Sequence, residues 1–165
     1  MQSTSPDGDR TCMRLAIEAS ARALDGGDMP FGATMVLPDG TIHVSQNRQL
    51  TGADVTAHAE VVVVREATAL FGAKALRGST VYASGEPCPM CAGTMFWAGV
   101  TRVVYGATAN DIIDALGEPS MPLRIAEALA GTSPVVTIEG PLLVDEAVAV
   151  LLRFKTRTTS EMRTP

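Results

Sequence analysis

The 165 residues predict a three-layer α/β/α sandwich around a mixed sheet of about five strands. First, segments with helical periodicity alternate with short segments rich in β-branched residues along the whole chain. Second, an apolar fraction of 46% is enough to fill one ordinary core. Third, no internal repeat, low-complexity tract or long linker interrupts the pattern. Residues 1–165 are therefore expected to form a single domain.

The chain is expected to begin with a helix and a hairpin. Apolar residues at helical spacing predict a helix over 10–25, which Gly26-Gly27 would end. Two strands, 31–37 and 41–46, are predicted around the turn Pro38-Asp39-Gly40.

The next segment, 57–70, is ambiguous. The run Val61–Val64 favours a strand by propensity. The length of the segment, the surrounding Ala, Glu and Arg, and Gly72 as a stop signal favour a buried helix instead. We predict the helix.

The second half continues the alternation. The predicted elements are a strand over 79–83, a helix over 88–98, a strand over 102–106, a helix near 121–130, a strand over 134–138 and a helix near 144–157. Pro87 and Gly99 bracket the helix over 88–98.

Composition narrows the functional classes. The formal net charge is −5, whereas proteins that bind polyanions usually carry a basic excess, so a nucleic-acid substrate is disfavoured but not excluded. The first eleven residues, MQSTSPDGDRT, lack the apolar run of a signal peptide. No segment is apolar over the length of a bilayer. We therefore expect a cytoplasmic protein without membrane attachment.

Four residues carry the chemistry: His58 and Glu60 in a TAHAE stretch, and Cys88 and Cys91 in a PCPMC stretch. Both stretches fall at the predicted start of a helix. Two thiolates and one imidazole suit zinc, and three protein ligands leave one coordination position for water. Cys88 and Cys91 are three residues apart, which places both sulfurs on one side of a helical turn. The helix N-terminus also favours the thiolate forms.

Glu60 is the expected proton carrier. In a regular helix, a residue two positions after His58 would point away from it, but the first turn can still let the carboxylate reach the metal. A carboxylate there can take a proton from water and pass it to a ring nitrogen and a departing amine. That is the requirement of hydrolytic deamination.

Three other interpretations stay open. A structural zinc site would need a fourth ligand, for which Cys12 and His43 are the spare candidates. A C-x-x-C pair can also be a redox couple. His58 can be an ordinary residue at a helix start. The combination of H-x-E and a later P-C-x-x-C is nevertheless the signature of zinc deaminases.

The chain resembles the cytidine deaminase superfamily, most closely the branch with bacterial guanine deaminases, cytosine deaminases and tRNA adenosine deaminases. The similarity covers about residues 12–110. It rests on Pro30-Phe31-Gly32-Ala33, Asn47, the TAHAE stretch, EPCPMCAG at 86–93 and RVVYGA at 102–107. The resemblance implies the same fold, one bound zinc ion per chain and a homodimer.

The resemblance also implies roles for individual residues. His58, Cys88 and Cys91 match the zinc ligands, and Glu60 matches the proton shuttle. Asn47 matches the position whose amide holds the edge of the base, and a turn-forming Asn is the alternative. The backbone N–H groups of Ala59 and Cys88 match positions that line the reacting centre.

Substrate choice depends on positions outside this set. Phe31 and Trp97 resemble the free-base branch, where aromatic side chains can sandwich a planar ring, and core packing is the alternative for each. Asp111 aligns with an acidic residue that guanine deaminases place over the substrate, and a helix N-cap is its alternative. Asp114 is a weaker substitute.

The C-terminal residues favour a tRNA substrate instead of a free base. Residues 136–154 resemble the end of tRNA adenosine deaminases. The basic side chains Arg153, Lys155, Arg157 and Arg163 could hold phosphates, although a solvated helix face is the alternative.

Deamination of a small free heterocycle is the leading hypothesis, with guanine as the best single substrate and cytosine or aminotriazines also compatible. Wobble-adenosine deamination in tRNA is the second hypothesis. A non-catalytic zinc-bearing interaction domain is the third.

Overall fold

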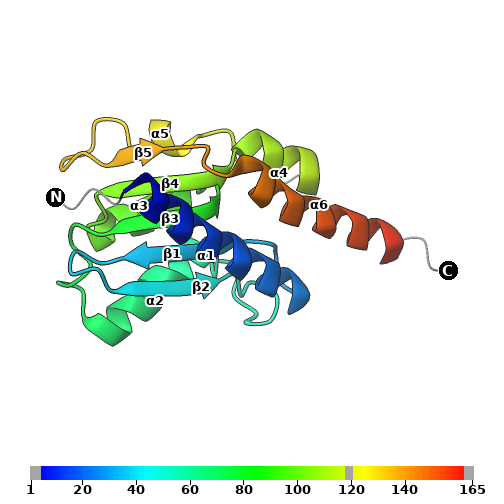
Figure 1. Cartoon of the computed structure of the whole chain (residues 1–165), viewed down its shortest axis with the longest axis horizontal. Coiled ribbons are helices and arrows are strands. Elements are labelled where there is room, and N and C mark those ends of the chain that lie inside the picture. Colours follow the sequence, from blue (N-terminus) through cyan, green and yellow to red (C-terminus); the bar gives the residue numbers. More distant parts are fainter. Residues whose placement is uncertain (1–4, 118–120, 162–165) are drawn as a thin grey trace.

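The computed structural model describes residues 5–117 and 121–161 (Figure 1). A five-stranded sheet lies between helices. The elements in chain order are α1 (Pro6–Asp25), β1 (Gly32–Val36), β2 (Ile42–Gln46), α2 (Ala59–Phe71), β3 (Thr80–Gly85), α3 (Pro89–Ala98), β4 (Arg102–Ala107), α4 (Ala109–Leu116), α5 (Ile125–Ala128), β5 (Thr137–Glu139) and α6 (Val144–Glu161). The predicted α/β sandwich with a mixed sheet is confirmed.

The sheet has the order β2-β1-β3-β4-β5. β1 is antiparallel to both β2 and β3, whereas β3, β4 and β5 are parallel. Side chains alternate between the two faces along each strand. Val81 and Val103 belong to a core that α2, α3 and α5 complete, and Tyr82 and Val104 belong to a second core shared with α1 and α6.

The ambiguous segment is a helix, as predicted. All four residues Val61–Val64 are buried, and α2 packs on β1, β2 and α3. Burial on several sides explains why a β-branched run tolerates the helix, because tertiary packing outweighs a propensity difference of about 0.5 kcal/mol per residue.

Several predicted boundaries differ from the structure. α1 begins at Pro6, four residues before the predicted start, because Ser5 caps it by accepting a hydrogen bond from the N–H of Gly8 at 3.2 Å. The helix expected near 121–130 is reduced to the four residues of α5. A helix that the sequence analysis missed, α4, follows β4 directly.

One guanidinium joins the parallel strands to α1. Arg102 on β4 binds Asp9 of α1 at 2.8 Å and Glu139 of β5 at 2.7 Å. The hydroxyl of Tyr82 also donates to Asp9. The hydrogen bonds to Glu139 and Asp9 raise the pKa of Arg102 above its usual range. This network lies at the amino ends of β3 and β4, and so at the opposite end of the strands from the residues described below.

Gly32 lets α1 sit directly on β1. A Cβ at this position would lie 2.2 Å from the carbonyl oxygen of Ala16 and 2.5 Å from the amide nitrogen of Ser20, both backbone atoms of α1. A Gly32→Ala variant is therefore expected to lose about 2–4 kcal/mol of unfolding free energy, because helix and strand must separate.

Urea denaturation would measure this loss, with Gly93→Ala as the matched control. A Cβ at Gly93 on α3 would meet nothing within 4 Å, so this variant should be neutral or gain up to about 1 kcal/mol. Equal midpoints for the two variants would contradict the close packing of α1 on β1.

None of the helices in the described ranges is both long and apolar enough to cross a membrane.

Candidate functional site

The topology brings the chemistry-bearing residues to one edge of the sheet. β3 and β4 are parallel and end together, because Gly85 pairs with Ala107. β1 runs the opposite way, so its first residue, Gly32, lies at the same edge and pairs with Gln46, the last residue of β2. The segments that follow or precede these ends hold Phe31, Asn47, Cys88 and Thr108. Ligand sites in α/β sheets favour such an edge.

Three side chains meet there around a common point. The Nδ1 atom of His58 lies 3.8 Å from the Sγ of Cys88 and 3.6 Å from the Sγ of Cys91, and the two sulfurs are 3.6 Å apart. These three residues form a group that can hold a metal ion. The predicted ligand set is therefore brought together in space.

The triangle has the size that zinc requires. Tetrahedral zinc with Zn–S of about 2.3 Å and Zn–N of about 2.05 Å places two sulfurs about 3.8 Å apart and a sulfur about 3.6 Å from a nitrogen. The observed separations of 3.6, 3.6 and 3.8 Å agree with these values within about 0.2 Å. The donor set of one imidazole and two thiolates also suits zinc.

Helix starts hold all three ligands. His58 is the N-cap residue of α2 and Cys88 is the N-cap residue of α3, and each has an extended backbone. Cys91 follows one turn into α3, where it is completely buried. The positive ends of both helices therefore point at the ligands, which favours thiolates and any negative charge that develops there.

The protonation of the two thiols is coupled. The hydrogen bond with Cys91 lowers the pKa of Cys88 to about 4, whereas the same bond and burial raise the pKa of Cys91 above its usual range. The two sulfurs share one proton in this bond, so the pKa of one thiol falls while the pKa of the other rises. The hydrogen bond between His58 and Cys88 also raises the pKa of His58. A divalent cation would displace these protons, because only thiolates and a neutral imidazole ligate metals.

Glu60 reaches the metal site. It is the second residue of α2, it is 6% exposed, and its Oε2 lies 3.4 Å from the Sγ of Cys91. The spacing argument that would turn Glu60 away fails because His58 lies outside the helix, with φ −62° and ψ 150°. Burial raises the pKa of Glu60, while the charge on His58 opposes the shift. A carboxyl group with a raised pKa can both accept and donate a proton near neutral pH.

Asn47 is next to the metal-binding segment. Its backbone N–H donates to Phe31, and the N–H of Arg48 donates to Ala57, the residue before His58. The side chain of Asn47 is completely buried, and its Oδ1 accepts from the N–H of Gln49 at 2.9 Å. This is an Asx turn, as the turn-forming alternative predicted, and it leaves part of the amide's bonding capacity for another partner.

Phe31 packs across the end of β3. Its ring and the side chain of Ile112 press on Gly85, where an added Cβ would lie 3.0 Å from Phe31 Cε1 and 2.8 Å from Ile112 Cδ1. Phe31 is half-buried and contacts both cores. The ring therefore lies against the end of β3, next to Ile112 of α4.

Trp97 is on the outside of this chain. It lies near the end of α3, its side chain is 85% exposed, and it meets Phe96 edge-on at 5.3 Å. Core packing, the alternative considered for Trp97, is therefore wrong. Its predicted role as a wall of the substrate pocket would need a surface that covers it.

Asp111 closes the first turn of α4. Its Oδ2 accepts from the backbone N–H of Thr108 at 2.8 Å, and its own N–H donates to the hydroxyl of Thr108. Thr108 is the N-cap residue, so Asp111 occupies the third helical position of a capping box rather than the N-cap position itself. The pattern Thr-x-x-Asp was a readable signal for the helix that the sequence analysis missed. Asp114 also lies on α4, where its backbone oxygen accepts from Lys155.

Glu86 joins the metal-binding segment to α4, a role that the sequence analysis did not assign. Its carboxylate accepts from the backbone N–H of Ala109 at 2.9 Å, and its backbone N–H donates to Ala107. Ala109 is the first residue of α4. The segment that leads into Cys88 and the helix that carries Asp111 are therefore bonded together.

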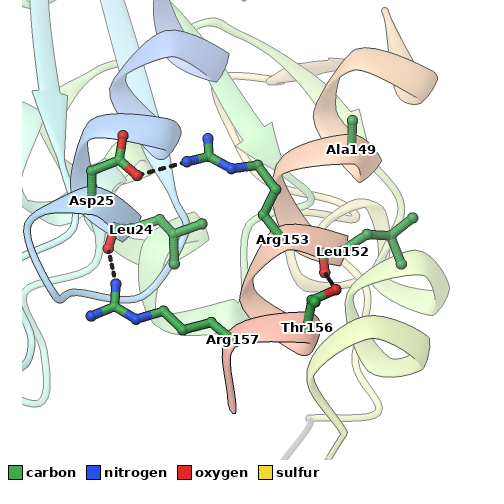
Figure 2. A pocket seen from close by; sticks show the side chains of 7 residues that line it. All are labelled: Leu24, Asp25, Ala149, Leu152, Arg153, Thr156 and Arg157. Atoms are coloured by element: carbon green, nitrogen blue, oxygen red, sulfur yellow. Dashed lines mark hydrogen bonds and ion pairs between the residues drawn. The ribbon is translucent and has the colours of Figure 1, made fainter. Parts of the chain in front are cut away.

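The basic residues of α6 bind this chain itself. Arg153 pairs with Asp25 at 2.6 Å, and Arg157 donates to the backbone oxygen of Leu24 at 2.9 Å (Figure 2). These contacts cross a shallow groove between the end of α1 and the middle of α6, away from the metal ligands. Lys155 is held by α4 as noted above. Arg163 lies outside the described residues. The predicted phosphate-binding face is therefore largely engaged in docking α6.

Residues 6–107 match the family described as the cytidine and deoxycytidylate deaminase zinc-binding region. Over 144 residues the chain is 33% identical to a probable cytosine deaminase of Schizosaccharomyces pombe, which covers 85% of this chain and 88% of that protein. A guanine deaminase of Bacillus subtilis is 38% identical over 106 residues, 64% of this chain and 68% of that protein. A tRNA-specific adenosine deaminase of the same species is 38% identical over 99 residues, 60% and 62% of the two chains.

Solved structures of other proteins have a similar fold. A point mutant of NE0047 in complex with 8-azaguanine superimposes with a TM-score of 0.79 at 27% identity, covering 90% of this chain and 85% of that one. A tRNA deaminase studied for A-to-I editing at the wobble position gives a TM-score of 0.70 at 29% identity, covering 85% and 98%. The chain therefore belongs to the cytidine and deoxycytidylate deaminase family of hydrolytic deaminases, and zinc is the cofactor that fits its His58, Cys88 and Cys91.

Proposed function

We propose that this protein removes the amino group of a small free heterocycle by hydrolysis, and that guanine, which would give xanthine and ammonia, is the best single substrate. The observation that carries the proposal is the buried carboxylate of Glu60 beside the triangle of His58, Cys88 and Cys91. A structural metal site has no need of such a carboxylate. The non-catalytic zinc domain is therefore disfavoured.

The metal site and Glu60 would have separate roles in the reaction. Zinc, when bound, would supply Lewis acidity that makes water a better nucleophile. The Glu60 carboxylate takes a proton from water, delivers it to a ring nitrogen, and later protonates the departing amine. In the overall reaction one water is consumed, the C–N bond breaks, a carbonyl forms on the ring carbon, and ammonia leaves.

The residues around this centre would orient the ring. The amide of Asn47 can donate and accept at once, which suits the edge of a heterocycle. The ring of Phe31 would contact a planar substrate, and the carboxylate of Asp111, which already accepts from Thr108, would accept a further bond from a substrate N–H. The backbone N–H groups of Ala59 and Cys88, at the two helix starts, would line the reacting centre. The exposed Trp97 fits a pocket wall completed by the partner in a homodimer.

The free-base assignment draws on the relatives and on the surface of α6. The relatives include a guanine deaminase and a probable cytosine deaminase, and NE0047 structures hold 8-azaguanine or 2,6-diaminopurine. In the protein described here the net charge is −5, and Arg153, Lys155 and Arg157 bind protein groups. A polynucleotide would find few basic side chains on this helix without partners of their own.

The prediction is tested by ammonia release from guanine, cytosine, adenine and aminotriazines with the zinc-loaded protein. We expect turnover of at least one of them, with guanine fastest, and little change in kcat/KM between about 50 and 200 mM salt, since a neutral base makes no phosphate contacts. Silence across the panel would reject the free-base assignment.

Deamination of wobble adenosine in tRNA is the second candidate, favoured by the 38% identity to a tRNA-specific adenosine deaminase. That reaction needs an extruded base and contacts to the flanking phosphates, so it should weaken by about 10³-fold or more over the same salt range. Inosine formed in tRNA without turnover of any free base would establish it in place of the first.

A further inference from the structure

The side-chain amide of Asn47 is held at both of its polar atoms by one residue, Gln49. Oδ1 of Asn47 accepts from the backbone N–H of Gln49 at 2.9 Å, and Nδ2 of Asn47 donates to Oε1 of Gln49 at 2.8 Å. The other end of the Gln49 amide donates to the backbone oxygen of Val55 at 3.1 Å. Three consecutive bonds therefore link Asn47, Gln49 and Val55.

These bonds fix which atom of the Asn47 amide faces which way. A backbone N–H can only donate, so it must meet Oδ1, and the Val55 oxygen can only accept, so it must meet Nε2 of Gln49. Oε1 of Gln49 is then the atom left to face Nδ2. A rotation of the Asn47 amide by about 180° would replace both bonds with contacts between like groups, which is costly for a buried side chain.

We call the three bonds among Asn47, Gln49 and Val55 the Asn47 clasp. Two further contacts anchor the segment that holds it. Asp28, which is 3% exposed, accepts from the backbone N–H groups of Leu50 at 2.7 Å and Thr51 at 3.1 Å. On the other side, the bond from Arg48 to Ala57 ties the clasp to the residue before His58. The orientation of the Asn47 amide is therefore defined relative to the metal ligands.

We infer that Gln49 is a positioning residue that sets substrate specificity through Asn47. With one N–H and one oxygen lone pair committed to Gln49, the bonds among residues 5–117 and 121–161 leave Asn47 one N–H donor and one lone pair, in a fixed order. This pair complements a ring edge with a carbonyl oxygen beside an N–H, and it opposes an edge with the reversed order. The inference rests on the proposed function, because it assumes that Asn47 contacts the heterocycle.

Guanine and 2,6-diaminopurine test the inference, since both carry a 2-amino group but reverse the order of donor and acceptor at positions 1 and 6. Gln49→Ala removes the bond to Nδ2 of Asn47 and leaves only the backbone N–H of residue 49 to hold the amide, so the amide is held less tightly in its orientation. We expect kcat/KM for guanine to fall about 10-fold, and the ratio of kcat/KM for guanine over 2,6-diaminopurine to fall by at least that factor. Most of the change should be in KM, with the zinc content unchanged.

Two further variants separate amide orientation from general damage. Gln46→Ala makes the same substitution at the end of β2 and should leave the ratio at the wild-type value. Gln49→Glu keeps an oxygen for Asn47 but loses the N–H for Val55, so it should keep the ratio even if the melting temperature falls. A ratio unchanged in Gln49→Ala, or lost equally in Gln49→Glu, would overturn the inference.

A measurement on the protein alone separates this inference from the proposed function. In the wild type the two side-chain N–H protons of Asn47 should give distinct NMR resonances that exchange slowly with water, and Gln49→Ala should speed the exchange at least 10-fold. If no base in the panel is deaminated, the proposed function fails while this experiment still decides on the clasp. Equal exchange in the two proteins would show that Gln49 does not hold the amide.

Discussion

Replacing Glu60 by glutamine is expected to lower kcat/KM by a factor of about 10³ or more, while the zinc content and the fold stay unchanged. The substitution keeps the size of the side chain but removes the group that carries protons. Since burial already disfavours the charged form of this carboxyl group, the neutral amide should not destabilise the protein. Glu60→Ala should lose turnover equally while still holding zinc.

The measurements are steady-state kinetics on the best substrate of the panel, zinc by mass spectrometry and thermal unfolding. Glu18→Gln makes the same substitution at an exposed position of α1 and should keep full activity. Retained turnover in Glu60→Gln with normal zinc would mean that another group carries the proton. Loss of zinc would mean that Glu60 acts mainly on the metal site.

Replacing Cys91 by serine is expected to abolish zinc binding and to lower the melting temperature markedly. A buried ligand of the triangle is lost, and serine is a poor ligand for zinc at neutral pH. Since zinc binds only the folded site, its loss removes a stabilisation of about 4 kcal/mol at a free metal concentration 1,000 times the dissociation constant. Activity should fall to background at the same time.

Cys12→Ala is the matched control. Cys12 is also buried, but it belongs to the core between the sheet and α1, on the other face from the ligands. It should keep one zinc ion per chain even if it is somewhat less stable. Removing zinc from the wild type with a chelator should reproduce the stability of Cys91→Ser. Full zinc occupancy in Cys91→Ser would reject the ligand assignment.

The sequence was most informative where local spacing alone determines position. Cys88 and Cys91 occupy one helical turn, and a proline and a glycine bracket α3, so the pair of sulfurs could be placed without any tertiary information. Spacing alone did not determine the position of Glu60, because its reach depends on whether His58 is inside or outside the helix. The extended backbone of His58 decides the question, and that conformation depends on the loop before it.

Other features depended on contacts that a linear pattern does not contain. The charges of Arg153 and Arg157 were visible, but their partners on α1 were not. Trp97 was expected either in the core or in a pocket, but its side chain is 85% exposed. This exposure depends on which elements pack beside α3, and the sequence around Trp97 does not contain that information. The helix near 121–130 was predicted too long, and α4 was missed although the capping signal of Thr108 and Asp111 marked its start.

The bond between Glu86 and the first turn of α4 has an evolutionary consequence. The family match ends at residue 107, directly before the N-cap of α4. Since Glu86 and the capping box fix where that helix starts, the segment that leads into Cys88 is tied to the first residues beyond the family match. Changes in length along a lineage are therefore expected to be tolerated after α4 more readily than between Glu86 and Ala109, where an inserted residue would break this bond.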